Sequence, residues 1–73
     1  MELRELLTPG KKIRIFINEG NPNNCTQHIR AIVDEDQIVY KVYSRNRQFS
    51  RYFVEHIGHF ENMHKNGWLS RAK

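Results

Sequence analysis

A chain of 73 residues suffices for one small domain, which should bury only about 60% of the surface that its unfolded form exposes. The single cysteine, Cys25, excludes an internal disulfide and favours a reducing, cytoplasmic setting. The sequence has no signal-peptide pattern and no apolar run approaching the roughly 18 residues that span a bilayer, which predicts a soluble protein with no membrane partner. Twelve Lys and Arg against eight Asp and Glu give a net charge of +4, which favours polyanionic partners.

Residues 1–7 are expected to form a short helix. Leu3, Leu6 and Leu7 follow the helical i, i+3, i+4 spacing. Pro9 ends the segment, because it lacks an N–H donor and disfavours helix in the residue before it. Two turns of helix cannot hold alone in water, so these leucines must dock on the sheet or on a partner, and we expect the sheet.

Residues 11–18 alternate between isoleucines and mostly polar positions, which predicts a strand. Ile13, Ile15 and Ile17 share one face. The opposite face carries Lys12, Arg14, Phe16 and Asn18. A loop is expected over 19–24, which contains glycine, proline and three asparagines.

Three strand-like runs follow, at 26–34, 37–45 and 48–57. They are rich in β-branched and aromatic residues, and short polar links separate them: an acidic one first, then a basic one. The sequence therefore predicts a three-stranded antiparallel meander onto which the rest of the chain packs.

The pattern of burial selects the register of the first hairpin in this meander, because a one-residue slip would mix apolar and polar residues on both faces. Pairing Val33 with Ile38 produces one face that is apolar throughout and should turn inward. That face consists of Ile29, Ala31, Val33, Ile38, Tyr40 and Val42. The other face then places Arg30 opposite Lys41, a like-charge pair that is unfavourable unless an anion bridges it. This juxtaposition is the most specific indication of an anionic ligand.

The strand at 48–57 has apolar residues on both faces, with Phe53 on one and Tyr52 and Val54 on the other. We therefore expect the core to cover one face and an attached element to cover the other. The C-terminal tail is the candidate for that element.

The tail is expected to form a second helix over 59–66. Asn66-Gly67 supplies a C-terminal stop for it. Trp68 and Leu69 should then return to the core or lie in a groove, and 70–73 should be a frayed basic end.

Together these elements predict an α+β fold that is mostly β, with 1–73 as a single domain. The expected architecture is a small antiparallel sheet of four to five strands with a short N-terminal helix and a C-terminal helix. A partly open barrel of the SH3-like or Sm-like kind is similar in element order and is the alternative.

A group of cations and aromatic residues in the meander gives the main functional indication. Cations track a phosphate backbone, exposed aromatic rings offer stacking surfaces for bases, and arginine makes bidentate contacts with phosphate or carboxylate. The predicted binding residues are Arg30, Lys41, Tyr43, Arg45, Arg47 and Arg51.

Two pairs of potential zinc ligands are also present, Cys25 with His28 and His56 with His59. Residues three apart on a strand point to opposite faces, so we expect no metal site, and no pattern indicates a cofactor. Glycine-rich phosphate loops, nucleophile elbows and recognisable carboxylate pairs are missing from the sequence, which predicts that the protein is not an enzyme.

The sequence thus predicts a small non-catalytic module that binds nucleic acid or another polyanion through the basic and aromatic face of the meander. The alternative is a protein-interaction or regulatory module that docks on an acidic protein partner. The surplus of apolar residues at both chain ends also leaves a homodimer open.

Overall fold

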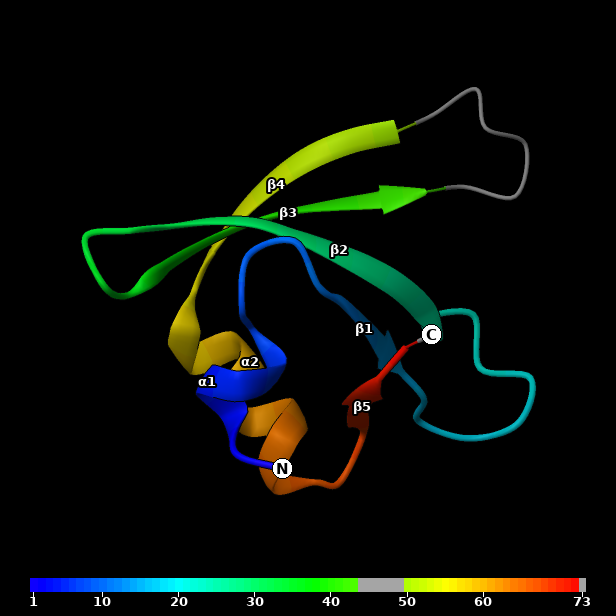
Figure 1. The fold of residues 1–73 in the computed structure, drawn as a ribbon. Helices are drawn as coiled ribbons and strands as arrows, with labels where there is room; N and C mark the ends of the chain where they lie inside the picture. The colour runs from blue at the N-terminus through cyan, green and yellow to red at the C-terminus, as the bar shows by residue number, and fades with distance from the viewer. Residues whose placement is uncertain (44–49, 73) are drawn as a thin grey trace.

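The structure is a computed structural model that describes residues 1–43 and 50–72. The elements follow one another as α1 (Leu3–Leu6), β1 (Lys12–Ile15), β2 (Cys25–Val33), β3 (Gln37–Tyr43), β4 (Ser50–His56), α2 (Ile57–Lys65) and β5 (Leu69–Arg71). The five strands form one open antiparallel sheet in the order β4-β3-β2-β1-β5 (Figure 1). The predicted α+β class, the mostly β content and the two helices are confirmed, and the sheet is open rather than closed into a barrel.

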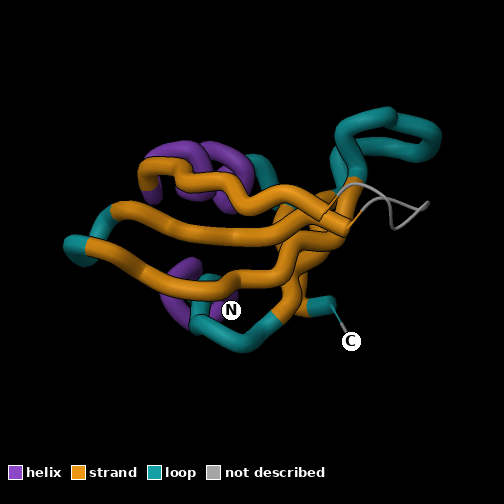
Figure 2. Tube along the Cα trace, turned by 90° about the horizontal axis from the view of Figure 1, so that it is seen from above, coloured by secondary structure: helices purple, strands orange, loops and turns teal. Residues whose placement is uncertain are grey.

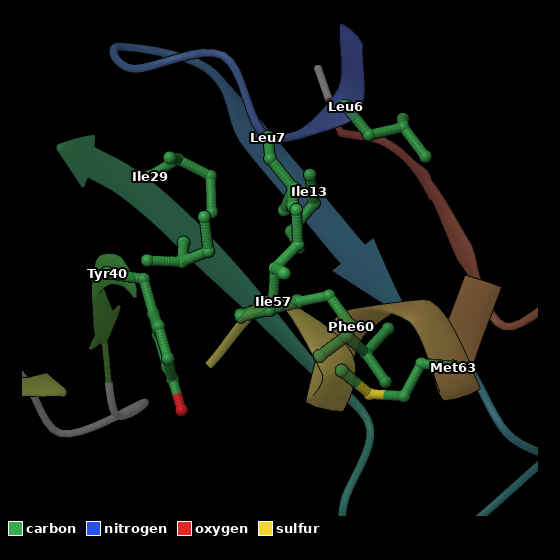
Figure 3. Packing of buried hydrophobic residues seen from close by; sticks show 10 residues of the cluster. Leu6, Leu7, Ile13, Ile29, Tyr40, Ile57, Phe60 and Met63 are labelled. Atoms are coloured by element: carbon green, nitrogen blue, oxygen red, sulfur yellow. The ribbon is translucent and has the colours of Figure 1, made fainter. Parts of the chain in front are cut away.

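Both helices lie on the same side of the sheet, and the core fills the space between them and the strands (Figures 1 and 3). We call this side of the sheet the covered face. Alternate residues of β1, β2 and β3 supply its apolar side chains, as the period of two along a strand requires. The buried core consists of Leu6, Leu7, Ile13, Ile15, Ile29, Ile38, Tyr40, Ile57, Phe60 and Met63.

The opposite side of the sheet, which we call the outer face, carries no helix from the described part of the chain. Figure 2, seen from above, shows the strands side by side in one bent layer. Neither described helix has the length and apolar character needed to cross a membrane.

The two chain ends close the core. Leu6 of α1 and Leu7, which caps it, are buried in the core, which confirms that the short N-terminal helix docks on the sheet. The prediction of a frayed end beyond residue 69 is wrong, because Leu69–Arg71 forms the edge strand β5 beside β1. The side chain of Arg71 also donates from Nη2 to the backbone oxygen of Glu5 at 2.6 Å, so it ties the tail to α1.

A β-bulge in β2 overturns the predicted register of the first hairpin. Ile29 pairs with Tyr40, but Ala31 pairs with Val39, so Arg30 is an extra residue with no partner position on β3. The extra residue reverses the alternation along the rest of β2.

The reversal changes which residues turn inward beyond the bulge. Ile32 now pairs with Ile38 and packs against the core, whereas Val33 pairs with Gln37 and is 46% exposed. The predicted inward positions of Ala31 and Val33 are therefore wrong. The inward positions of Ile29, Ile38 and Tyr40 agree with the structure.

Several element ends differ from the sequence-based boundaries because side chains replace backbone partners. β1 stops at Ile15, and the backbone N–H of Ile17 donates to Asn24 Oδ1 at 2.8 Å instead of to a neighbouring strand. α2 starts at Ile57, two residues earlier than predicted, because the ring Nδ1 of His56 caps it by accepting from the N–H of Gly58 at 3.0 Å.

Candidate binding face

One row of side chains crosses four strands on the outer face. Lys12 of β1 pairs with His28 of β2, His28 pairs with Lys41 of β3, and Lys41 pairs with Tyr52 of β4. Directly paired residues on one face have Cβ atoms about 5 Å apart, so these four side chains are consecutive neighbours. We call them the basic row.

The charges of the basic row act on His28 together. Partial burial, followed by the positive charges of Lys12, Arg30 and Lys41, lowers the pKa of His28 below its ordinary value of 6.5. Three cations from three neighbouring strands thus surround one imidazole, and their combined field favours its neutral form. A site of this kind favours anions.

Tyr52 ends the basic row with an aromatic ring at the sheet edge. The Nζ atom of Lys41 lies 5.3 Å from the centre of that ring, within the range of a cation–π contact. Tyr52 is 63% exposed, so a large part of the ring is available to a ligand.

A second aromatic feature lies further along β1. A shallow groove of about 390 Å³ is lined by Arg14, Phe16, Gly67, Trp68 and Ser70. The guanidinium of Arg14 sits 5.4 Å from the centre of the Phe16 ring. Because each residue of an extended chain advances it by about 3.3 Å, Phe16 lies roughly 13 Å from Lys12, and Arg14 links the groove to the basic row.

An apolar strip borders the basic row on its other side. The paired residues Ala31, Val39 and Val54 cross β2, β3 and β4 on the outer face. Val54 is 61% exposed, and Val33 at the end of β2 is also exposed. The outer face therefore combines a cationic centre with an aromatic groove on one flank and an exposed aliphatic strip on the other.

The structure brings some of the predicted site residues together and separates others. Lys41 and Arg30 both act on His28, although His28 rather than Arg30 stands opposite Lys41, so the expected like-charge pair is wrong. Arg51 pairs with Val42 and belongs to the other face of the sheet, where it is exposed.

The remaining predicted residues are not placed at the site. Tyr43 ends β3, but its side chain is outside the described part of the structure, and Arg45 and Arg47 lie outside the described residues.

The binding residues predicted from the sequence did not include Lys12, His28 or Tyr52, although the predicted register already placed His28 on the same face as Lys41. The alternation of β1 does place Lys12 opposite the isoleucines, which was the available indication. That β1 lies beside β2, with Lys12 opposite His28, is set by the fold and not by any local pattern.

The cysteine and histidine pairs do not converge. Cys25 is on the covered side of β2 opposite Ile15, whereas His28 is on the outer face. Within the described residues, no three His, Cys, Asp or Glu side chains are grouped so that they could hold a metal ion. Burial raises the pKa of the Cys25 thiol, partly opposed by a hydrogen bond from Gln27, so the reactive thiolate is disfavoured at neutral pH.

Comparisons with protein-family models, with curated proteins and with solved structures found no match to this chain.

Proposed function

We propose that this protein is a non-catalytic module that binds single-stranded nucleic acid across the outer face of its sheet. The observation that carries the proposal is the convergence of Lys12, Arg30 and Lys41 around His28 on a face that no described helix covers. A phosphate backbone laid across the sheet would neutralise these charges. A cytoplasmic location stays a prediction.

The aromatic residues favour a single strand over a duplex. Unstacked bases can lie on exposed rings, and each such contact contributes about 1–3 kcal/mol with little sequence preference. Tyr52 at one end of the basic row and Phe16, which lines the groove, offer exposed rings beside the cationic centre.

The test is a titration of a labelled single-stranded oligonucleotide of about 12 nucleotides, within the usual range of site sizes, at several salt concentrations. The double variant Lys12→Glu/Lys41→Glu should bind at least tenfold more weakly. Each phosphate contact that is lost releases fewer counterions from the nucleic acid, and that release favours binding. Two lost contacts at about 0.7 each should also lower the slope of log K against log salt by about 1.4.

The matched control reverses two other exposed cations, Arg4 and Lys65, which lie on the helices of the covered side. Arg4→Glu/Lys65→Glu changes the net charge by the same amount, so it should keep the salt slope and most of the affinity. Equal losses in both double variants would show that net charge alone drives binding. If neither the parent nor the variants bind the oligonucleotide at low salt, the proposal is wrong.

His28 supplies a second readout within the site. Partial burial, followed by the neighbouring cations, lowers the pKa of His28. A bound polyanion offsets the charge of those cations and should raise that pKa, and NMR titration of the His28 ring with and without oligonucleotide measures the change. An unchanged His28 pKa in a saturated complex would place the nucleic acid elsewhere on the protein.

A second candidate is docking on an acidic protein partner, and the exposed aliphatic strip favours it. Val33 and Val54 offer apolar area that a nucleic acid would not use, beside cations that suit carboxylates. An acidic peptide that competes with the oligonucleotide, and that Val54→Ser weakens, would support this reading over the first.

A further inference from the structure

The edge strand β4 is long and regular for the edge of a sheet. It has β3 on one side and no described strand on the other. Its seven residues pair with β3 in an unbroken register and include no proline, glycine or lysine. Long, regular and unprotected edge strands are templates for pairing with another strand. The other edge strand, β5, has only three residues.

The middle of β4 is also unusually apolar for a solvent-facing edge. Tyr52, Phe53 and Val54 are 63%, 39% and 61% exposed. The expectation that the C-terminal tail covers the second face of this strand is wrong, because α2 and β5 pack on the covered side of the sheet. Tyr52 and Val54 are therefore mostly exposed on the outer face, and Phe53, on the covered side, keeps part of its surface exposed beside Tyr40.

We propose that β4 pairs antiparallel with β4 of a second copy of this chain, about a two-fold axis at Phe53. The inference goes beyond nucleic-acid binding and does not depend on it. In this register Phe53 meets Phe53 of the second copy, and Tyr52 meets the Val54 of that copy. Arg51 meets Glu55 of the second copy. By symmetry the Tyr52–Val54 and Arg51–Glu55 pairs each occur twice, and the Phe53 pair on the axis occurs once.

Charge complementarity selects this register among its neighbours. Arg51 and Glu55 are equidistant from Phe53, so only an axis at Phe53 places opposite charges across from each other twice. An axis at Tyr52 would place Arg51 opposite Phe53, and an axis at Val54 would place Glu55 opposite Phe53. Both alternatives leave the charges without a partner across the interface.

The backbone phase of β4 agrees with this register. The N–H of Ile57 donates to the backbone oxygen of Asp36 on the β3 side at 2.7 Å. Antiparallel ladders alternate, so Arg51, Phe53 and Glu55 share the orientation of Ile57 toward β3, and Tyr52 and Val54 present their N–H and C=O groups to the open edge. Pairing Tyr52 with Val54 of the second copy joins those outward groups.

The stacking of Phe53 on Tyr40 would continue across the two-fold axis. Phe53 stacks on Tyr40 of its own chain with ring centres 5.4 Å apart and an interplanar angle of 16°. Two such stacks would meet at the axis, at a position of the ladder without hydrogen bonds, where facing side chains approach most closely.

Such a dimer would place both outer faces on the same side of a continuous sheet, because a two-fold axis between antiparallel strands is perpendicular to the sheet. The basic rows of the two copies would then lie on one surface. The second copy is a better occupant than an unrelated strand because β4 is complementary to itself.

The experiment measures molar mass by sedimentation velocity from micromolar to millimolar protein. The parent chain should convert from monomer to dimer. Arg51→Glu and Glu55→Arg should each weaken self-association about tenfold or more, because each change creates two like-charge pairs in place of two opposite ones. An equimolar mixture of the two variants should recover dimer formation as a heterodimer, since both charge pairs are then opposite.

Val54→Pro provides a second variant that keeps the fold. Its N–H faces the open edge, where proline is tolerated, so the ladder with β3 is retained while the intermolecular donor is lost. Circular dichroism checks folding, and self-association should be abolished. Lys65→Glu, on α2, is the charge control and should associate like the parent.

Three outcomes would overturn the proposal. The first is a parent that stays monomeric throughout the range, and the second is assembly beyond a dimer. The third is a dimer that Arg51→Glu and Val54→Pro leave unchanged, since another surface would then hold it. If a strand of a different protein binds β4 in place of a second copy, the parent alone remains monomeric and the first outcome applies.

Discussion

The two faces of the sheet are built from alternating residues of the same strands, yet they differ in almost every physical property. Ile13 and Ile15 of β1 are buried under the helices, while Lys12 and Arg14, which alternate with them, are exposed. The covered face is apolar and closed by α1 and α2. The outer face gathers cations, aromatic rings and an aliphatic strip without a described cover. The covered face therefore carries stability, and the outer face is available for binding.

The two faces also differ in how they shift the pKa values of ionisable side chains. On the covered face, burial, followed by the nearby Glu55 and Cys25, raises the pKa of Tyr40 to about 12, so this ring stays a neutral packing element. On the outer face, like charges beside His28 persist in solvent at a small cost. Such a cost is tolerated where a ligand of opposite charge removes it.

The largest expected effect comes from removing the centre of the covered face. Phe60 is fully buried and meets Tyr40 edge to face, with ring centres 5.5 Å apart. Phe60→Ala should lower the free energy of unfolding by about 3–5 kcal/mol, through lost burial and the cavity left behind. Urea denaturation measures this loss.

Its control on the outer face is Tyr52→Ala. Because Tyr52 is mostly exposed, this truncation should change stability by no more than about 0.5 kcal/mol in dilute protein. Similar losses in the two variants would contradict the division of roles between the faces.

An intermediate effect is expected at the one buried polar side chain of the described core, Gln27. Its Oε1 atom has no hydrogen-bond partner, and its Nε2 makes only a long contact of 3.8 Å to the Cys25 sulfur. Gln27→Met keeps the length of the side chain and removes an unsatisfied buried group, so it should stabilise the fold by about 1 kcal/mol. Gln37→Met, at a half-buried outer-face position, should gain less. A destabilised Gln27→Met protein would mean that the amide is needed where it is.

The smallest effect concerns the pH dependence of stability. The folded-state pKa of His28 is lowered, so the unfolded chain takes up its proton first as the pH falls through about 6.5. The contribution of neutral His28 is therefore complete above that pH and is lost on acidification. Melting curves measure this effect. The melting temperature should fall less between pH 7.5 and pH 5.5 in His28→Gln than in the parent.

His59→Gln, on the exposed surface of α2, is the control for this measurement and should keep the drop of the parent. If both substitutions reduce the drop equally, the pH dependence does not come from the cations around His28.

The sequence alone determined the elements and one of the two faces. Local period and composition place β1 to β4 and both helices, because side-chain alternation and helical spacing depend only on neighbouring residues. The buried isoleucines of β1 and the inward Ile29, Ile38 and Tyr40 followed from the same rule.

The tertiary structure decided which residues of neighbouring strands lie opposite each other. The bulge at Arg30 reversed the alternation of β2, and a period-two rule cannot foresee an inserted residue. Placing Lys12 beside His28, making Leu69–Arg71 an edge strand and leaving β4 at the edge of the described sheet all depend on contacts between segments far apart in the chain. The sequence therefore determined where β1 to β4 lie, and the packing of the strands decided that Leu69–Arg71 forms a fifth strand and which side chains meet on the outer face.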